Sequence, residues 1–97
     1  MELEAVLLGL VEIEKRIRLK ISGVECYIFG SILKDSWNSN DIDILVLYQN
    51  EQHISIVRRE MEETKTELPL HVSYLTYNEE TELNFISRYG AKLVFRT

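Results

Sequence analysis

Apolar residues recur at steps of three and four near the start of the chain, which predicts an amphipathic helix over about residues 2–20. Ser22-Gly23 is expected to end this helix, whose inward positions are Leu3, Val6, Leu7, Leu10, Ile13, Ile17 and Ile21. Residues 24–29 are mostly apolar strand formers and predict a first strand, which ends at Gly30. The chain is therefore expected to open with a helix and a strand that share a core.

The next segment predicts a short helix and a strand around two aspartates. Ser31 is expected to cap a short helix that runs to about Trp37, after which Asn38-Ser39-Asn40 forms a turn. Residues 41–48 first alternate carboxylate and apolar positions and then become wholly apolar. This pattern is typical of a strand with one end in a site and the rest buried.

The second half of the chain continues the alternation of helices and strands. Residues from about 51 to 64 carry apolar side chains on one helical face, and residues 70–75 predict a third strand after Pro69. Thr76 and Glu79 fit a capping box for a last helix, which is expected to end at Gly90 and to turn Leu83, Ile86 and Tyr89 inward. Residues 92–95 add a short strand.

This order of elements predicts the fold class. Residues 1–97 are expected to form one domain of the α/β (α+β) class, with a small mixed β-sheet covered by helices. The length and a hydrophobic content of 45% suit a single core. Cys26 lies in an apolar run and has no other cysteine to pair with, so it is expected to be a buried core residue.

The charge and hydropathy of the chain argue against membrane proteins and nucleic-acid-binding proteins. No stretch approaches the roughly 18 apolar residues of a membrane span, and the start Met-Glu-Leu-Glu lacks the cationic segment of a secretory signal. We therefore expect a cytoplasmic protein without membrane contact. A net charge of −5 argues against stable binding of nucleic acid by this chain alone. The end of the first helix carries four cations, Lys15, Arg16, Arg18 and Lys20, and cations are favourable at a helix C-terminus. Binding of phosphate or of an acidic partner by these side chains stays an open alternative.

The chemically informative residues are a Gly30-Ser31 pair after the first strand and Asp41 and Asp43 at the start of the next. The glycine turn exposes backbone N–H groups and a hydroxyl, which suits triphosphate oxygens. Two carboxylates two residues apart on a strand share a face, so both can reach one hard cation such as Mg²⁺. Together they predict a site for metal-assisted phosphoryl chemistry.

These residues resemble the signature of the DNA polymerase beta superfamily of nucleotidyltransferases, and within it the minimal nucleotidyltransferases of bacteria and archaea. The resemblance implies a nucleotidyltransferase (polymerase beta palm-like) fold. It also implies that Gly30 and Ser31 bind a nucleoside triphosphate, expected to be ATP, and that Asp41 and Asp43 hold Mg²⁺ or Mn²⁺. Asn40 stands where a Ser or Thr is common in the family.

One position departs from the family pattern. Active members carry a third carboxylate on the next strand, and the pattern places His71 there, with no Asp after residue 43. Glu67 shares the strand face of His71, but four residues at about 3.3 Å each put it roughly 13 Å away. His71 either keeps an altered reaction going, as a metal ligand or proton acceptor, or lies in a site that has lost its chemistry.

Two functions therefore stand as hypotheses. The first is a nucleotidyltransferase that moves a nucleoside monophosphate onto a hydroxyl, expected on a separately encoded partner protein because the chain is short. By resemblance, the leading role is an antitoxin that modifies a HEPN-type toxin. The second is a catalytically degenerate module that acts by binding a nucleotide, a partner protein or both, with the partner docking on the first helix, Trp37 or Tyr77. A polymerase or repair domain is disfavoured by the acidic charge. Nothing in the sequence fixes the oligomeric state, so a homo-oligomer stays open.

Overall fold

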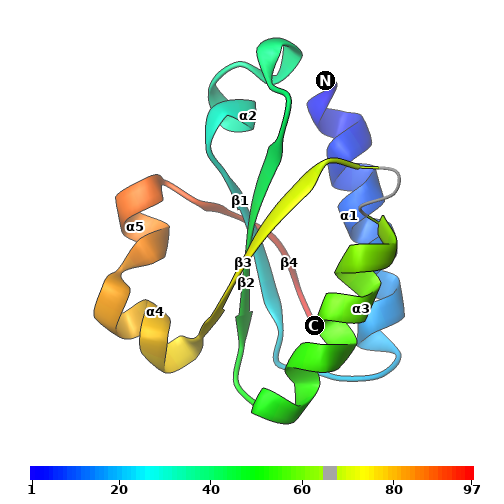
Figure 1. The fold of residues 1–97 in the computed structure, drawn as a ribbon, viewed down its shortest axis with the longest axis vertical. Coiled ribbons are helices and arrows are strands. Elements are labelled where there is room, and N and C mark those ends of the chain that lie inside the picture. The colour runs from blue at the N-terminus through cyan, green and yellow to red at the C-terminus, as the bar shows by residue number, and fades with distance from the viewer. Residues whose placement is uncertain (65–67) are drawn as a thin grey trace.

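The computed structural model describes residues 1–64 and 68–97, which form a four-stranded mixed sheet between two groups of helices (Figure 1). The strand order is β3-β2-β1-β4, with β1 antiparallel to both of its neighbours and β2 parallel to β3. The strands are β1 (Glu25–Phe29), β2 (Ile42–Tyr48), β3 (Leu70–Thr76) and β4 (Lys92–Arg96). The predicted fold class is confirmed.

Two long helices cover one face of the sheet, and short helices lie on the other face and at one end (Figure 1). The long helices are α1 (Leu3–Arg18) and α3 (Ile54–Thr64), and α3 is preceded by the 3₁₀ turn η2 (Glu51–His53). The short elements are α2 (Ser31–Lys34), the 3₁₀ turn η1 (Ser36–Asn38), α4 (Tyr77–Leu83) and α5 (Phe85–Tyr89). None of the described helices is long and apolar enough to cross a membrane.

The main core lies between the sheet and the two long helices. The predicted inward stripe of α1 is buried at Val6, Leu10, Ile13 and Ile17, and it packs against alternate residues of β1 and β2. Cys26 belongs to this core, and its burial raises the pKa of the thiol. Its prediction as a core residue is confirmed.

Strand β2 is buried on both faces because helices cover both sides of the sheet at its centre. Ile42, Ile44 and Val46 face α1 and α3, whereas Leu45 and Leu47 point to the opposite face and are also fully buried. This double burial explains why its sequence is wholly apolar after Asp43.

Two expectations about the short helices are wrong. Gly30, not Ser31, is the N-cap residue of α2, which ends at Lys34 before a separate 3₁₀ turn. The helix expected from the capping box at Thr76 exists, but Asn84 adopts a left-handed conformation and divides it into α4 and α5. Leu83 and Tyr89 are exposed rather than inward.

Glu60 joins the two long helices from a buried position. Its carboxylate accepts hydrogen bonds from Arg16 Nε at 2.8 Å and from Lys20 Nζ at 2.7 Å, while its own side chain is 4% exposed. Lys15 and Arg18 pair with Glu12 and Glu14 on α1 itself. The cationic cluster predicted at the end of the first helix is therefore engaged by glutamates of the same chain.

We expect Glu60→Gln to lower the free energy of unfolding by about 1–2 kcal/mol, because the two cations lose a buried charged partner. The hydrogen bond from Lys20, followed by that from Arg16, lowers the pKa of Glu60, whereas burial opposes the shift. A carboxyl group whose pKa is lower in the folded state stabilises the fold at pH values above its unfolded pKa. This stabilisation is lost as the pH falls through the pKa of the folded state.

Urea unfolding at neutral pH and at successively lower pH, below about pH 5, checks this prediction. Glu12→Gln is the matched control, because its pair with Lys15 is exposed on both sides and should contribute under about 1 kcal/mol. Equal losses for the two variants would contradict a special role for Glu60.

Candidate active site

The predicted site residues gather at the end of the sheet where β1 ends and β2 and β3 begin (Figure 1). The strand register places Phe29, Asp43 and His71 side by side in one row across β1, β2 and β3. Their side chains lie on the face opposite α1 and α3, because the neighbouring positions Ile28, Ile44 and Val72 face the main core.

Gly30 packs directly against Asp43. Its backbone has φ 85° and ψ −157°, a combination that residues with a side chain avoid. A Cβ atom at this position would lie 3.1 Å from Cγ of Asp43. Both conformation and space therefore require glycine here, and the absence of a side chain keeps the carboxylate of Asp43 accessible from the α2 side.

Ser31 and Asp41 are linked through Ser39. The Ser39 hydroxyl donates to the carbonyl oxygen of Asp41 at 2.9 Å, which uses its single proton. The Ser31 hydroxyl, 2.9 Å from Ser39 Oγ, must therefore donate to Ser39. Ser39 is buried, whereas Ser31 and Asp41 are exposed. A buried serine thus fixes the Gly30-Ser31 turn relative to the aspartate segment.

Asp43 and His71 are in polar contact, with Oδ1 of the carboxylate 3.3 Å from Nδ1 of the imidazole. An ionised carboxylate only accepts hydrogen bonds, so the proton of a neutral imidazole lies on Nδ1 and Nε2 is left as an acceptor. The His71 side chain is 83% exposed and that of Asp43 27%. The imidazole is thus oriented by Asp43 and open to an incoming molecule.

The oxygen atoms of Asp41 and Asp43 suit a hard divalent cation. Mg²⁺ is usually bound through one or two carboxylates, with substrate phosphates and water completing its shell. Asp41 lies one residue before β2, and Asp43 is the second residue of the strand. Within the described ranges, no group of three or more His, Cys, Asp or Glu side chains is arranged to hold a metal. The oxygen donors of the two aspartates are of the chemical kind that a hard divalent cation takes.

Comparison with known protein families identifies the family to which this chain belongs. The family model described as polymerase beta nucleotidyltransferase matches residues 12–96, which include all five predicted site residues. The chain belongs to the polymerase beta nucleotidyltransferase family. Among curated proteins, no match to this nucleotidyltransferase chain is found. The family assignment supports nucleotidyl transfer as its general chemistry.

In this family member, the fold brings together Gly30, Ser31, Asp43 and His71 as the sequence predicts, with Asp41 held just outside the strand. Glu67, considered as a substitute for the third carboxylate, lies outside the described residues. Ser39 is not among the predicted site residues, because the sequence shows it only as part of a polar turn. Its burial depends on contacts with Ser31 that no local pattern signals.

Gly30→Ala should lower the free energy of unfolding by about 2–4 kcal/mol, because it adds a strained backbone conformation to a clash with Asp43. Gly23→Ala is the matched control. Gly23 also has positive φ, at 81°, but a Cβ there would meet nothing within 4 Å, so its cost should be about 1 kcal/mol. Urea denaturation measures both values. Similar losses would show that crowding against Asp43 is unimportant.

Proposed function

We propose that this chain transfers a nucleoside monophosphate from a nucleoside triphosphate, ATP in the first instance, to a hydroxyl group on a partner protein. The observation that carries the proposal is the contact of Asp43 with both Gly30 and His71 in a member of the nucleotidyltransferase family. This contact brings a carboxylate, a glycine turn and an imidazole together, and these groups support the roles proposed below.

In the proposed reaction, the acceptor oxygen attacks the α-phosphorus of the triphosphate. A new oxygen–phosphorus bond forms, the bond to the oxygen bridging to the β-phosphate breaks, and pyrophosphate leaves with that electron pair. The hydroxyl proton passes to Nε2 of His71, whose Nδ1 proton is held by Asp43. A bound Mg²⁺ or Mn²⁺ supplies charge neutralisation on the phosphates, with Asp41 and Asp43 as its protein ligands.

The Gly30-Ser31 turn is proposed to position the triphosphate. Support comes from family membership and from the close approach that Gly30 permits beside Asp43. The Ser31 hydroxyl donates a hydrogen bond to Ser39, and its lone pairs point away from that bond. This hydrogen bond must break before the Ser31 hydroxyl can donate to a phosphate oxygen. Positioning of this kind is a large part of phosphoryl-transfer catalysis.

The acceptor is proposed to be a separately encoded protein, in the manner of an antitoxin acting on a HEPN-type toxin. This step follows from the resemblance to minimal nucleotidyltransferases. The exposure of the His71 side chain is compatible with a bulky acceptor.

The second candidate is a catalytically inactive module that acts by binding a partner. It is favoured by the imidazole at the position where the family pattern has a third carboxylate, and by the exposure of Trp37, whose side chain is 76% exposed on η1. Tyr77 is a weaker docking residue, because its hydroxyl donates to the carbonyl of Gly23 and its ring is half-buried.

Radiolabel transfer distinguishes the two candidates. The native protein, alone and with a separately encoded neighbouring protein, is incubated with each labelled triphosphate in Mg²⁺ or Mn²⁺. We expect labelling of the partner that falls at least about a hundredfold in Asp41→Asn and Asp43→Asn, because each loses a charge at the reacting phosphates. Asp35→Asn is the control, since Asp35 is exposed and bonds to Asn38.

The variant His71→Asp gives the deciding comparison. Labelling by the native protein that declines in His71→Ala supports a working site with an imidazole. Silence of the native protein with every triphosphate, together with activity of His71→Asp, would instead show a disabled site, overturn the enzymatic proposal and point to the binding module.

A further inference from the structure

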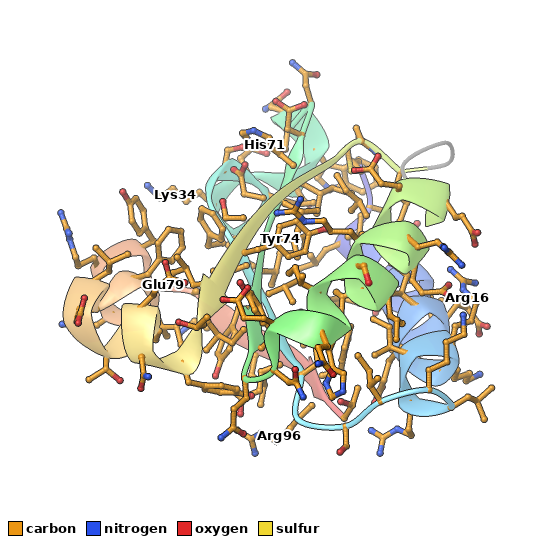
Figure 2. The ribbon with its side chains drawn as sticks, turned by 60° about the horizontal axis from the view of Figure 1, so that its bottom comes forward. Arg16, Lys34, His71, Tyr74, Glu79 and Arg96 are labelled. Carbon is orange, nitrogen blue, oxygen red and sulfur yellow. The ribbon has the colours of Figure 1, made fainter. Side chains whose placement is uncertain are left out.

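The outer edge of β3 is open to pairing with another strand. β3 is the outermost strand on its side of the sheet, and no described residue pairs with its outer edge. In Figure 1, β3 crosses the front of the molecule and no described helix passes in front of it. Figure 2 shows the side chains of His71 and Tyr74, which lie near the beginning and in the middle of this strand. Its unpaired main-chain groups form a template for the addition of a strand.

The two edge strands of the sheet differ in how their edges are protected. β4 carries Lys92 and Arg96 and has an irregular register against β1, and Arg18 of α1 donates to the carbonyl oxygen of Arg96 at 2.8 Å. Charges, bulges and covering elements are the usual devices that keep an edge from pairing with other chains. β3 has no Lys, Arg, Asp, Glu, Gly or Pro between its bounds, and its register with β2 runs without a shift. An edge without these devices suits a docking role.

The hydrogen-bond pattern shows which main-chain groups of β3 face outward. Ile42 donates its N–H to the carbonyl oxygen of Pro69 at 3.0 Å, which in a parallel pair directs the N–H and carbonyl of His71 toward β2. Main-chain groups alternate between the two sides along a strand, so those of Val72 and Tyr74 point to the outer edge. Among the described residues, no hydrogen bond to these outward groups is present. Two residues therefore offer both a donor and an acceptor to an added strand.

The open part of this edge lies beside His71. At the far end of the strand, the N–H of Thr76 is already bonded to the carboxylate of Glu79 at 2.9 Å. Nδ1 of His71 faces Asp43 on β2, so Nε2, on the other side of the ring, faces away from β2. In an antiparallel addition, the residue opposite His71 would be a non-hydrogen-bonded partner, with Cα atoms about 4.5 Å apart and both side chains on one face.

We propose that the acceptor is an extended segment of the partner protein that adds to the outer edge of β3 and presents a hydroxyl side chain to Nε2 of His71. The inference rests on the proposed nucleotidyl transfer, and it names the conformation in which the acceptor binds. The hydroxyl proton passes to Nε2, the oxygen bonds to the α-phosphorus, and pyrophosphate leaves with the electron pair of the broken bond. Main-chain hydrogen bonds to Val72 and Tyr74 hold the segment in place.

Amide hydrogen exchange, measured by NMR, tests the docking apart from catalysis. In the free protein, the amides of Val72 and Tyr74 should exchange fast, whereas those of His71 and Ser73 should be protected by their bonds to β2. The probe is a short synthetic peptide that alternates threonine and valine, with a lysine at each end. At millimolar concentration, we expect this peptide to slow the exchange of Val72 and Tyr74 by about threefold or more.

Two matched peptides separate the main-chain bonds from the reacting hydroxyl. When a threonine lies opposite His71, valines lie opposite Val72 and Tyr74. N-methylation of the valines blocks the main-chain bonds and should abolish the slowing of exchange. O-methylation of the threonines keeps the strand but removes the hydroxyl. Exchange should then still slow, whereas label from a triphosphate in Mg²⁺ or Mn²⁺ should pass only to the unmodified peptide.

The variant Val72→Pro removes one outward N–H, and proline is tolerated at such a position of an edge strand. Val72→Ala loses apolar contacts of the same residue but keeps the N–H, so the difference between the two variants isolates the hydrogen bond. We expect label transfer to the threonine peptide to be at least about fivefold lower in Val72→Pro than in Val72→Ala. Circular dichroism of both variants checks that they fold.

The outcomes separate failure of the docking from failure of the transferase. Unchanged exchange of Val72 and Tyr74 with the threonine peptide, or equal slowing by the N-methylated peptide, would overturn the proposal. A native homodimer that Val72→Pro converts to a monomer, measured by light scattering, would also overturn it, because the edge would bind a second copy. If label passes to the partner protein without a change of exchange at this edge, the docking falls alone. If exchange slows but neither peptide nor partner is labelled with any triphosphate, the docking stands and nucleotidyl transfer falls.

Discussion

The register of β2 positions both the core residues and the candidate site. Both faces of this strand are covered, so its side chains must be apolar on each face. Ile42, Ile44 and Val46 pack against the long helices, and Leu45 and Leu47 are buried on the other side. A shift by one residue would move Asp43 into the main core, where an unpaired carboxylate is costly. The hydrophobic demand of the strand therefore also fixes the carboxylate beside Gly30 and His71.

Much of this architecture could be predicted because it depends on local periodicity. The stripe of α1, the alternation at the start of β2 and the capping box at Thr76 each specify an element without reference to distant residues. The row of Asp43 and His71 needed one further step. Their neighbouring positions follow from the parallel pairing of β2 with β3, which no local pattern in the sequence indicates.

The remaining features depend on contacts between distant parts of the chain. Asn84 has a left-handed conformation that its sequence permits but does not demand, so the division between α4 and α5 was not foreseen. Ser39 gains its role only when the turn brings it to Ser31. Likewise, the open edge of β3 exists only because the fold places this strand outermost in the sheet. Local patterns carry no information about such pairings.

The strand order has a consequence for how a macromolecule can approach the reacting end of the sheet. Strand β3 is the outermost strand on its side, and His71 lies near its beginning. In the described part of the chain, no further strand pairs with the outer edge of β3, so the backbone N–H and carbonyl groups of this edge are open to pairing with another segment. A strand added there would lie directly beside His71.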